Sequence, residues 1–461
     1  MSDEIDNILS SRVSRRDLIK KAGIGAGGVV MAGVISACGG SSTTTTTGSG
    51  SSASSVATTA STTATTVATA GTLKIGFVSP RTGAAASFGE ADGYVLDLVR
   101  KAFAPGIVVG GKTYAVQIID KDGQTNPQQG AAVAQELIAS DKVDLMLATS
   151  TPETTNPVAD SCEAAGVPCV TTTVPWEAWY FGRGAKPNQP SPFKFTYHFA
   201  YGTEQFFKSY TAAWPQVPTN KVVGVLLPND ADGNAQRAAF VPLLTKAGYT
   251  VVDPGPYPDG TNDFSAQIAK FKSADCQILN SLAIPPDFAV FWRQSAQLGY
   301  KPKVIQSGKS GLFPSDIVAL GPLGYGLASA AFFASIFPYK SSLTGATAQQ
   351  LCDGYEQASG KQYNPQIGPS MALFDVANAA LIASNDPSNK TAVVDAIKTL
   401  QVETPIGMLK WGTFAVPNVV PTSVINGQWI KGTGKWPVDW VSVENSEDAS
   451  IPVQAKLQPF A

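Results

Sequence analysis

From Thr72 onward, short apolar runs alternate with longer amphipathic stretches. Apolar runs bounded by glycine, proline and asparagine are typical of buried strands, and the amphipathic stretches between them are typical of helices. The predicted strands span residues 73–79, 114–120, 143–148, 168–172, 221–227, 250–254, 277–282 and 302–306. This alternation predicts an α/β fold in which parallel-type sheets are covered by helices.

Two asparagine-proline pairs mark predicted helix starts. Asn126-Pro127 and Asn156-Pro157 each place a preferred N-cap residue before a proline, which is tolerated at the first helical position. The helices that follow are expected over residues 128–139 and 158–165.

The N-terminal end of the chain has a different pattern. Arg15 and Arg16 precede residues 22–37, which carry no charge and end with small residues directly before Cys38. This arrangement resembles a twin-arginine signal peptide with a bacterial lipobox, which implies export, removal of residues 1–37 and lipidation of Cys38. A transmembrane anchor is the alternative, but the uncharged stretch is shorter than the ~20 residues that usually span a bilayer.

The next segment, residues 41–71, consists almost entirely of serine, threonine, alanine and glycine. Such a composition cannot bury enough apolar surface to offset the entropy of the chain. With the lipidated Cys38 at its start, the segment 38–71 is therefore predicted to be a disordered tether between the membrane and a folded domain.

Composition narrows the possible functions. The chain has 461 residues and a formal net charge of -2, with 15% charged residues. This length exceeds what one hydrophobic core usually holds, so two domain-sized units are expected. The net charge gives no sign of a basic surface that would bind nucleic acid. His198 is the single histidine and the cysteine spacing fits no zinc pattern, so neither a metal site nor a cofactor is predicted.

Several short segments follow one another in a characteristic order. They are LKIGFVSPRTG at residues 73–83, Phe88-Gly89, Asn126-Pro127, and residues 141–144, 165–168, 262–268 and 291–301. In order and spacing these segments resemble the leucine/isoleucine/valine-binding family of type I periplasmic solute-binding proteins, from Thr72 to about Trp440.

The resemblance implies two Rossmann-like lobes joined by three hinge crossings, with a small-molecule ligand in the cleft between them. The crossings are expected near residues 197–201, 327–333 and 408–411. The first lobe would comprise residues 72–199 and 333–409, and the second residues 200–332 and 410–461. A monomer that serves the permease and ATPase subunits of an ATP-binding-cassette (ABC) importer is also implied.

Hydroxyl side chains are concentrated where two predicted strands end. Ser150, Thr151 and Thr154 follow the strand 143–148, and Thr173 follows the next strand. Ligands of open α/β sheets bind beyond the carboxyl ends of the strands, and in the resembled family these two loops hold the carboxylate of the ligand. The alternative is that these residues serve only as strand and turn formers.

Two aromatic residues are candidates for packing against the body of the ligand. Phe88 occupies the place where the resembled family sets an aromatic side chain against the ligand. Trp176 follows the threonines and would offer a flat apolar face to an aromatic or hydrocarbon group. Core packing is the alternative for this tryptophan.

The second half of the candidate site departs from the family. Lys309 stands in the loop where amino-acid binders carry an acidic residue, and Ile284 lies in the loop that carries a tyrosine in those proteins. A lysine in the cleft would repel an ammonium group and attract a carboxylate, which makes a simple α-amino acid a doubtful ligand. Asp232, with Asp230 beside it, is the candidate for the missing negative charge, and a solvated Lys309 outside the cleft is the alternative.

Four cysteines remain besides Cys38. Cys162 and Cys169 are separated by a short helix-to-strand connection and are predicted to form a disulfide in an oxidising compartment. Cys276 and Cys352 are expected to be buried, unpaired thiols.

Together these features favour the extracytoplasmic substrate-binding component of an ABC importer, lipid-anchored on the outer face of the cell membrane. It would capture a small carboxylate-bearing or amide solute by hinge closure. A ligand sensor that presents the solute to a membrane receptor is the alternative. An enzyme is less favoured, because its chemistry would have to use His198, which lies in a strand pattern at a predicted crossing and is interpreted as structural.

Overall fold

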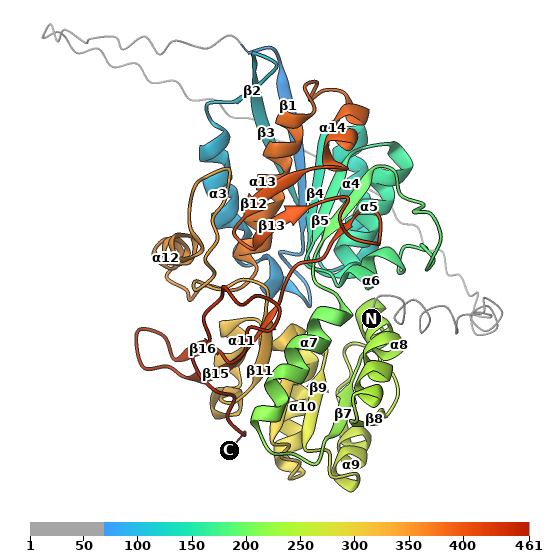
Figure 1. Ribbon diagram of the computed structural model, residues 1–461, viewed down its shortest axis with the longest axis vertical. Coiled ribbons are helices and arrows are strands. Elements are labelled where there is room, and N and C mark those ends of the chain that lie inside the picture. The colour runs from blue at the N-terminus through green and yellow to red at the C-terminus, as the bar shows by residue number, and fades with distance from the viewer. Residues whose placement is uncertain (1–68, 461) are drawn as a thin grey trace, which may run out of the picture. The chain divides into compact units, whose positions relative to one another are not determined.

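The described part of the chain forms two lobes, and each lobe is built around one β-sheet (Figure 1). The computed structural model describes residues 69–460, and all of them belong to one structural unit. The predicted signal peptide and almost all of the predicted tether lie outside the described residues. Within residues 69–460, no helix is both long enough and apolar enough to cross a bilayer.

The first sheet has the strand order β14-β6-β5-β4-β1-β3-β2. All neighbouring strands in it are parallel except β2 and β3. Its strands are β1 (Thr72–Ser79), β2 (Ile107–Val109), β3 (Lys112–Asp122), β4 (Leu145–Thr149), β5 (Cys169–Thr172), β6 (Thr196–Phe199) and β14 (Val419–Val420).

Helices cover both faces of this sheet, as expected for parallel strands. Ile75 and Phe77 of β1 pack in one apolar cluster with α3 and α13, whereas Val78 packs in another with α4 and α5. The helices of this lobe are α3 (Asp92–Phe103), α4 (Pro127–Ala139), α5 (Pro152–Ala165), α6 (Trp176–Tyr180), α12 (Ala348–Ser359), α13 (Ile367–Ala383) and α14 (Lys390–Ile397), with the 3-10 turn η1 (Ala86–Gly89). The hairpin β12 (Gln401–Thr404) and β13 (Gly407–Lys410) follows α14.

The second sheet has the order β16-β15-β11-β10-β9-β7-β8. Its neighbouring strands are parallel except that β15 is antiparallel to both β11 and β16. Its strands are β7 (Val222–Leu226), β8 (Thr250–Val252), β9 (Ile278–Ser281), β10 (Val304–Ser307), β11 (Ala328–Ala331), β15 (Ile425–Lys431) and β16 (Val438–Ser442). Its helices are α7 (Thr203–Ala213), α8 (Ala231–Lys246), α9 (Ser265–Ser273), α10 (Pro285–Gln297) and α11 (Pro314–Ala319), with the 3-10 turns η2 (Trp214–Gln216), η3 (Lys309–Gly311) and η4 (Gly321–Gly324).

The predicted α/β fold is confirmed, and each of the predicted strands corresponds to a strand of the structure. The chain passes from the first sheet to the second after Phe199 and leaves the second sheet after Ala331. It passes back to the second sheet between Val420 and Ile425. This third passage lies beyond residues 408–411, where it was expected, because β14 still pairs in parallel with β6.

One predicted helix start was wrong. Asn126 caps α4 as expected, since its side chain accepts a hydrogen bond from the backbone nitrogen of Gln129. Asn156, in contrast, lies inside α5, which already begins at Pro152. Because Thr151-Pro152 supplies an earlier proline for the first turn, Asn156 is not a cap and instead donates to the carbonyl of Ala178 at 3.2 Å.

The predicted disulfide is not formed. Cys162 on α5 and Cys169 at the start of β5 are both buried free thiols in the apolar cluster between helix and sheet. Burial and the neighbouring Cys169 raise the pKa of the Cys162 thiol well above its usual value. A protonated thiol is a poor nucleophile, so this environment slows attack by the Cys162 thiol.

We expect Asn126→Ala to lower the free energy of unfolding by ~1 kcal/mol, because the first turn of α4 loses its cap. Chemical denaturation of the full chain measures the change. Gln128→Ala, an exposed substitution in the same turn, is the control and should leave the unfolding midpoint unchanged. Equal effects of the two substitutions would show that the cap contributes nothing.

Candidate functional site

The backbone is strained where β4 and β5 end. Ser150 and Thr151 directly after β4 have φ angles of 63° and 48°, and Thr173 directly after β5 has a φ of 61°. Positive φ is uncommon for residues other than glycine, and for β-branched threonine it costs of order 1–3 kcal/mol. Parallel strands bring both ends to one edge of the sheet, so the strain is concentrated at a single place.

Two hydroxyl groups at this edge have no protein partner. Thr151 and Thr154 are buried, and neither hydroxyl oxygen has a hydrogen-bond partner within residues 69–460. Buried polar groups are nearly always paired, since leaving one unpaired costs about 1–3 kcal/mol. These hydroxyls are therefore candidates for bonds to a ligand.

A cavity lies between the two lobes at this edge. Its polar lining consists of two threonines and an ion pair, Thr151, Thr173, Asp232 and Lys309. The rest of the lining is glycine, proline and apolar or aromatic side chains, namely Phe88, Pro175, Tyr201, Phe206, Tyr210, Leu282, Gly308, Leu312, Ala330 and Phe332. A mainly apolar lining with a few polar groups is typical of small-molecule sites.

The structure brings five of the predicted site residues together at this cavity. They are Phe88, Thr151, Thr173, Asp232 and Lys309.

The other predicted site residues lie outside its lining. Ser150 has its hydroxyl 3.3 Å from that of Thr149, and Thr154 lies in α5 outside the lining. Ile284 only precedes α10 as its N-cap residue.

Trp176 is also outside the lining. Its ring packs against Phe181 and Phe414, with ring centroids 5.7 Å and 5.6 Å away. The contacts of this tryptophan therefore correspond to the core-packing alternative.

Sequence reasoning missed the aromatic wall of the second lobe. Tyr201, Phe206 and Tyr210 come from the first crossing and α7, and Phe332 comes from the second crossing. Tyr201 stacks on Phe332 with ring centroids 5.1 Å apart. The available signal was the run of aromatic residues that directly follows β6, since a hinge segment in such a fold borders the cleft.

Lys309 is not a free positive charge. Its ammonium lies 2.6 Å from a carboxylate oxygen of Asp230 and 2.9 Å from one of Asp232, and all three side chains are at most 8% exposed. Burial raises the pKa of Asp232, while the Lys309 ammonium opposes this increase. The second carboxylate oxygen of Asp232 is buried without a partner. The cluster can therefore accept a hydrogen bond from a ligand, whereas its lysine is already paired.

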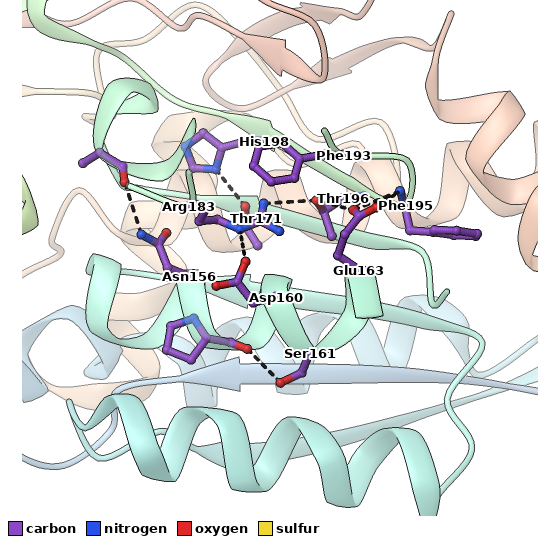
Figure 2. A network of polar contacts seen from close by, with 12 residues as sticks. Asn156, Asp160, Ser161, Glu163, Thr171, Arg183, Phe193, Phe195, Thr196 and His198 are labelled. Atoms are coloured by element: carbon purple, nitrogen blue, oxygen red, sulfur yellow. Dashed lines mark hydrogen bonds and ion pairs between the residues drawn. The ribbon is translucent and has the colours of Figure 1, made fainter. Parts of the chain in front are cut away.

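His198 is part of the sheet interior rather than of the cavity (Figure 2). Its Nε2 donates to the carbonyl oxygen of Val174 at 2.8 Å, its Nδ1 lies 2.8 Å from the hydroxyl of Thr171, and its ring stacks on Trp179. Burial, together with the charge of Arg183, lowers the pKa of His198 to about 3. The imidazole is therefore neutral and fully occupied by structural contacts.

Arg183 anchors the long connection between α6 and β6 in the same region (Figure 2). Its guanidinium donates to Asp160 at 2.7 Å and to Thr196 at 3.0 Å, and it lies over the rings of Trp179 and Phe193. Among residues 69–460, no group of three or more histidine, cysteine, aspartate or glutamate side chains is placed to hold a metal ion.

The family model for periplasmic binding proteins matches residues 72–433. The chain belongs to the periplasmic binding protein family. Leu/Ile/Val-binding protein homolog 8 of Brucella abortus is 23% identical over 351 residues, which cover 73% of this chain and 82% of the relative. The resemblance to the branched-chain amino-acid-binding branch is thereby confirmed.

Solved structures confirm the type I fold with its two lobes. A leucine-binding protein from Thermotoga maritima has a TM-score of 0.63 and 19% identity, covering 80% of this chain and 97% of that chain. An ABC transporter solute-binding protein from Rhodopseudomonas palustris, in complex with 4-hydroxybenzoate, has a TM-score of 0.64 and 18% identity, covering 82% and 99%. These relatives are solute-binding proteins, not enzymes.

Removing the lysine from the buried ion cluster tests its electrostatics. We expect Lys309→Met to lower the free energy of unfolding by ~3–5 kcal/mol at neutral pH, since two buried carboxylates lose their counter-ion. In wild type the Lys309 ammonium opposes the burial that raises the pKa of Asp232, so without it the folded variant binds more protons than the folded wild type as pH falls from about 7 towards 4. The deficit should therefore shrink over this range.

Thermal unfolding of both proteins across this pH range measures the effect. Lys361→Met is the control, because Lys361 forms an exposed pair with Glu90 and its loss should change little. A deficit that stays constant or grows on acidification would contradict the assigned charges.

Proposed function

We propose that this protein is the extracytoplasmic substrate-binding component of an ABC importer. It captures a small carboxylate-bearing or amide solute in the cavity between its lobes and presents it to permease and ATPase subunits. The observation that carries the proposal is one cavity with strained, hydroxyl-bearing strand ends on one side and an aromatic wall on the other.

The proposed capture depends on contacts that exist only when the lobes meet. Phe88 of the first lobe lies edge-on to Phe313 of the second, with ring centroids 4.7 Å apart, and Ser87 donates to Asp316 at 3.4 Å. A solute that touches both lobes binds the closed state more tightly than the open state and shifts the equilibrium towards closure by that difference. Closure of the hinge is then the signal that a permease reads.

The lining supports a solute with an apolar body and polar groups at its two ends. The aromatic wall suits a ring or a branched hydrocarbon. A carboxylate fits beside Thr151 and Thr173, and a hydrogen-bond donor fits beside the unpaired oxygen of Asp232. Since Lys309 is neutralised by its partners, an ammonium group on the solute is compatible with this arrangement.

Known ligands of related structures fall within this range. The leucine-binding protein of Thermotoga maritima and the solute-binding protein in complex with 4-hydroxybenzoate share the present fold, and leucine and 4-hydroxybenzoate each combine an apolar body with a carboxylate. The remaining proposed contacts, to Ser150, Thr154, Trp176 and Ile284, have no support from the cavity lining.

The sequence supports the proposed location of the protein. Residues 1–37 would direct export by the twin-arginine route, and a lipidated Cys38 with the tether that follows would hold a monomer on the outer face of the membrane.

Two matched substitutions test the site. We expect Thr151→Val to leave the melting temperature unchanged or raised, because its buried hydroxyl has no protein partner, and to weaken carboxylate binding ~10-fold or more. Thr155→Val should lower the melting temperature, since the Thr155 hydroxyl donates to the carbonyl of Thr151 at 2.9 Å. It should leave carboxylate binding unchanged, because Thr155 does not line the cavity.

Thermal shift followed by calorimetry with leucine, isoleucine, benzoate and 4-hydroxybenzoate supplies the measurements. A solute that binds only the folded state must raise its melting temperature. Binding of none of these carboxylates, or equal binding by wild type and Thr151→Val, would refute the proposed site.

The anchor has its own test. Cys38→Ser should move the protein from the membrane fraction to the soluble extracytoplasmic fraction, because the acylated thiol is lost. A chain carrying both Arg15→Lys and Arg16→Lys should instead stay in the cytoplasm. Retention of the Cys38→Ser protein in the membrane fraction would exclude a lipid anchor at this position.

A further inference from the structure

A second cavity lies on the opposite face of the strand that leads into the second crossing. Side chains of an extended segment point alternately to its two faces. Ala330 of β11 and Phe332 after it line the cavity described above, which we call the first cavity. The residues that alternate with them, Ser329, Ala331 and Phe333, line the second cavity. β11 and the start of the crossing therefore run between the two cavities.

The second cavity has a mainly aromatic wall that hydrogen bonds hold in place. Trp429 and Trp440 line it from the second lobe, and Tyr363 lines it from the first lobe. The indole nitrogen of Trp429 donates to the carbonyl of Gly311 at 2.7 Å, and that of Trp440 donates to the hydroxyl of Ser329 at 3.2 Å. Both rings are thus positioned before any solute arrives.

The second cavity also offers a hydrogen-bond acceptor that the protein leaves unused. Gln362 lines this cavity, and its side-chain nitrogen donates to the carbonyl of Val438 at 2.9 Å. The side-chain oxygen of Gln362 is buried and has no partner within residues 69–460. Buried polar atoms are nearly always paired. A solute group that entered the second cavity would therefore meet aromatic rings and one free acceptor.

Leu312 lies where the two cavities adjoin. Among residues 69–460 it is the only residue that lines both of them, and it is 7% exposed. Its neighbours in sequence are held on either side. The carbonyl of Gly311 accepts from Trp429, and the ring of Phe313 packs on Phe88 of the other lobe. Leu312 thus closes the first cavity towards the second from a backbone that is fixed in place.

We propose that Leu312 determines the specificity of the site by limiting the length of the solute. A solute with a single ring or a short branched chain fits the first cavity, whereas an added ring that would enter the second cavity collides with the leucine side chain. Such an overlap is costly because protein interiors are close-packed. The inference rests on the proposed function and narrows its solute class to compact solutes.

Shortening this side chain should join the cavities. We expect wild type to bind 3-phenylbenzoate and 4-phenylbenzoate at least about tenfold more weakly than benzoate, and Leu312→Ala to raise the affinity for one of them, relative to benzoate, about tenfold or more, since the added ring becomes buried between the aromatic walls. The pair leucine and homophenylalanine should respond in the same way. Leu312→Val, which removes less of the side chain, should give a smaller change in the same direction.

Two further variants show whether the second cavity is the space that is used. Leu282 lines only the first cavity, so Leu282→Ala enlarges that cavity without joining the two. It should change the affinity ratios by no more than about twofold. Ala331 lines only the second cavity, so a chain carrying both Leu312→Ala and Ala331→Leu should lose the gain seen with Leu312→Ala alone.

Calorimetry of the full chain with these solutes measures the ratios. A wild type that binds neither benzoate nor leucine overturns the proposed function and this inference with it. A wild type that binds one of them, but binds its extended analogue equally well, overturns the inference alone. The inference is also overturned if Leu312→Ala gains nothing, if Leu282→Ala gains as much, or if the gain persists with Ala331→Leu. Should Leu312→Ala fail to fold, the same comparison with Leu312→Val decides.

Discussion

A buried amide, that of Gln366, ties together parts of the first lobe that are far apart in sequence, and the geometry of the candidate site depends on this tie. It joins the start of α13 to the ends of β4 and β5, where Thr151 and Thr173 hold positive φ angles. Strained backbone persists only where the surroundings over-determine it. The long, nearly fully buried helix α13 provides that rigid support.

In the second lobe the corresponding constraint is a buried cluster of charged side chains. Asp230, Asp232 and Lys309 bury three charges next to an otherwise apolar wall, and their mutual attraction must offset a large desolvation cost. The arrangement keeps one carboxylate oxygen available at the cavity while cancelling the charge of the lysine. One side of the cavity therefore offers donors, the other an acceptor, and the space between them is apolar.

The sequence predicted the architecture well and the site only in part. β7 is a continuous run of apolar residues and glycine, and β1 departs from such a run only at Lys74 and at its two ends, so their pattern is unambiguous. β6, with the sequence TYHF, and the two-residue β14 carry no such pattern, and without β14 the third passage between the lobes could not be located. Thr151, Thr173 and Phe88 were found because the ends of parallel strands meet at one edge.

What escaped prediction depends on contacts between distant residues. Lys309 and Asp230 are 79 positions apart, and Gln366 and Thr149 are 217 positions apart, so no local pattern links them. The protonation of Cys162 likewise depends on how α5 packs against β5, which a short spacing between two cysteines does not reveal.

The third passage of the chain has a consequence for the order in which the molecule assembles. β14 completes the first sheet from a position close to the C-terminus, although β1 of the same sheet begins at Thr72. A nascent chain still on the ribosome cannot finish this lobe until translation has passed Val420, whereas most of the second sheet is synthesised in the interval. Contacts between residues so far apart in sequence slow folding. The N-terminal strands therefore stay incompletely paired until the later segments have been synthesised.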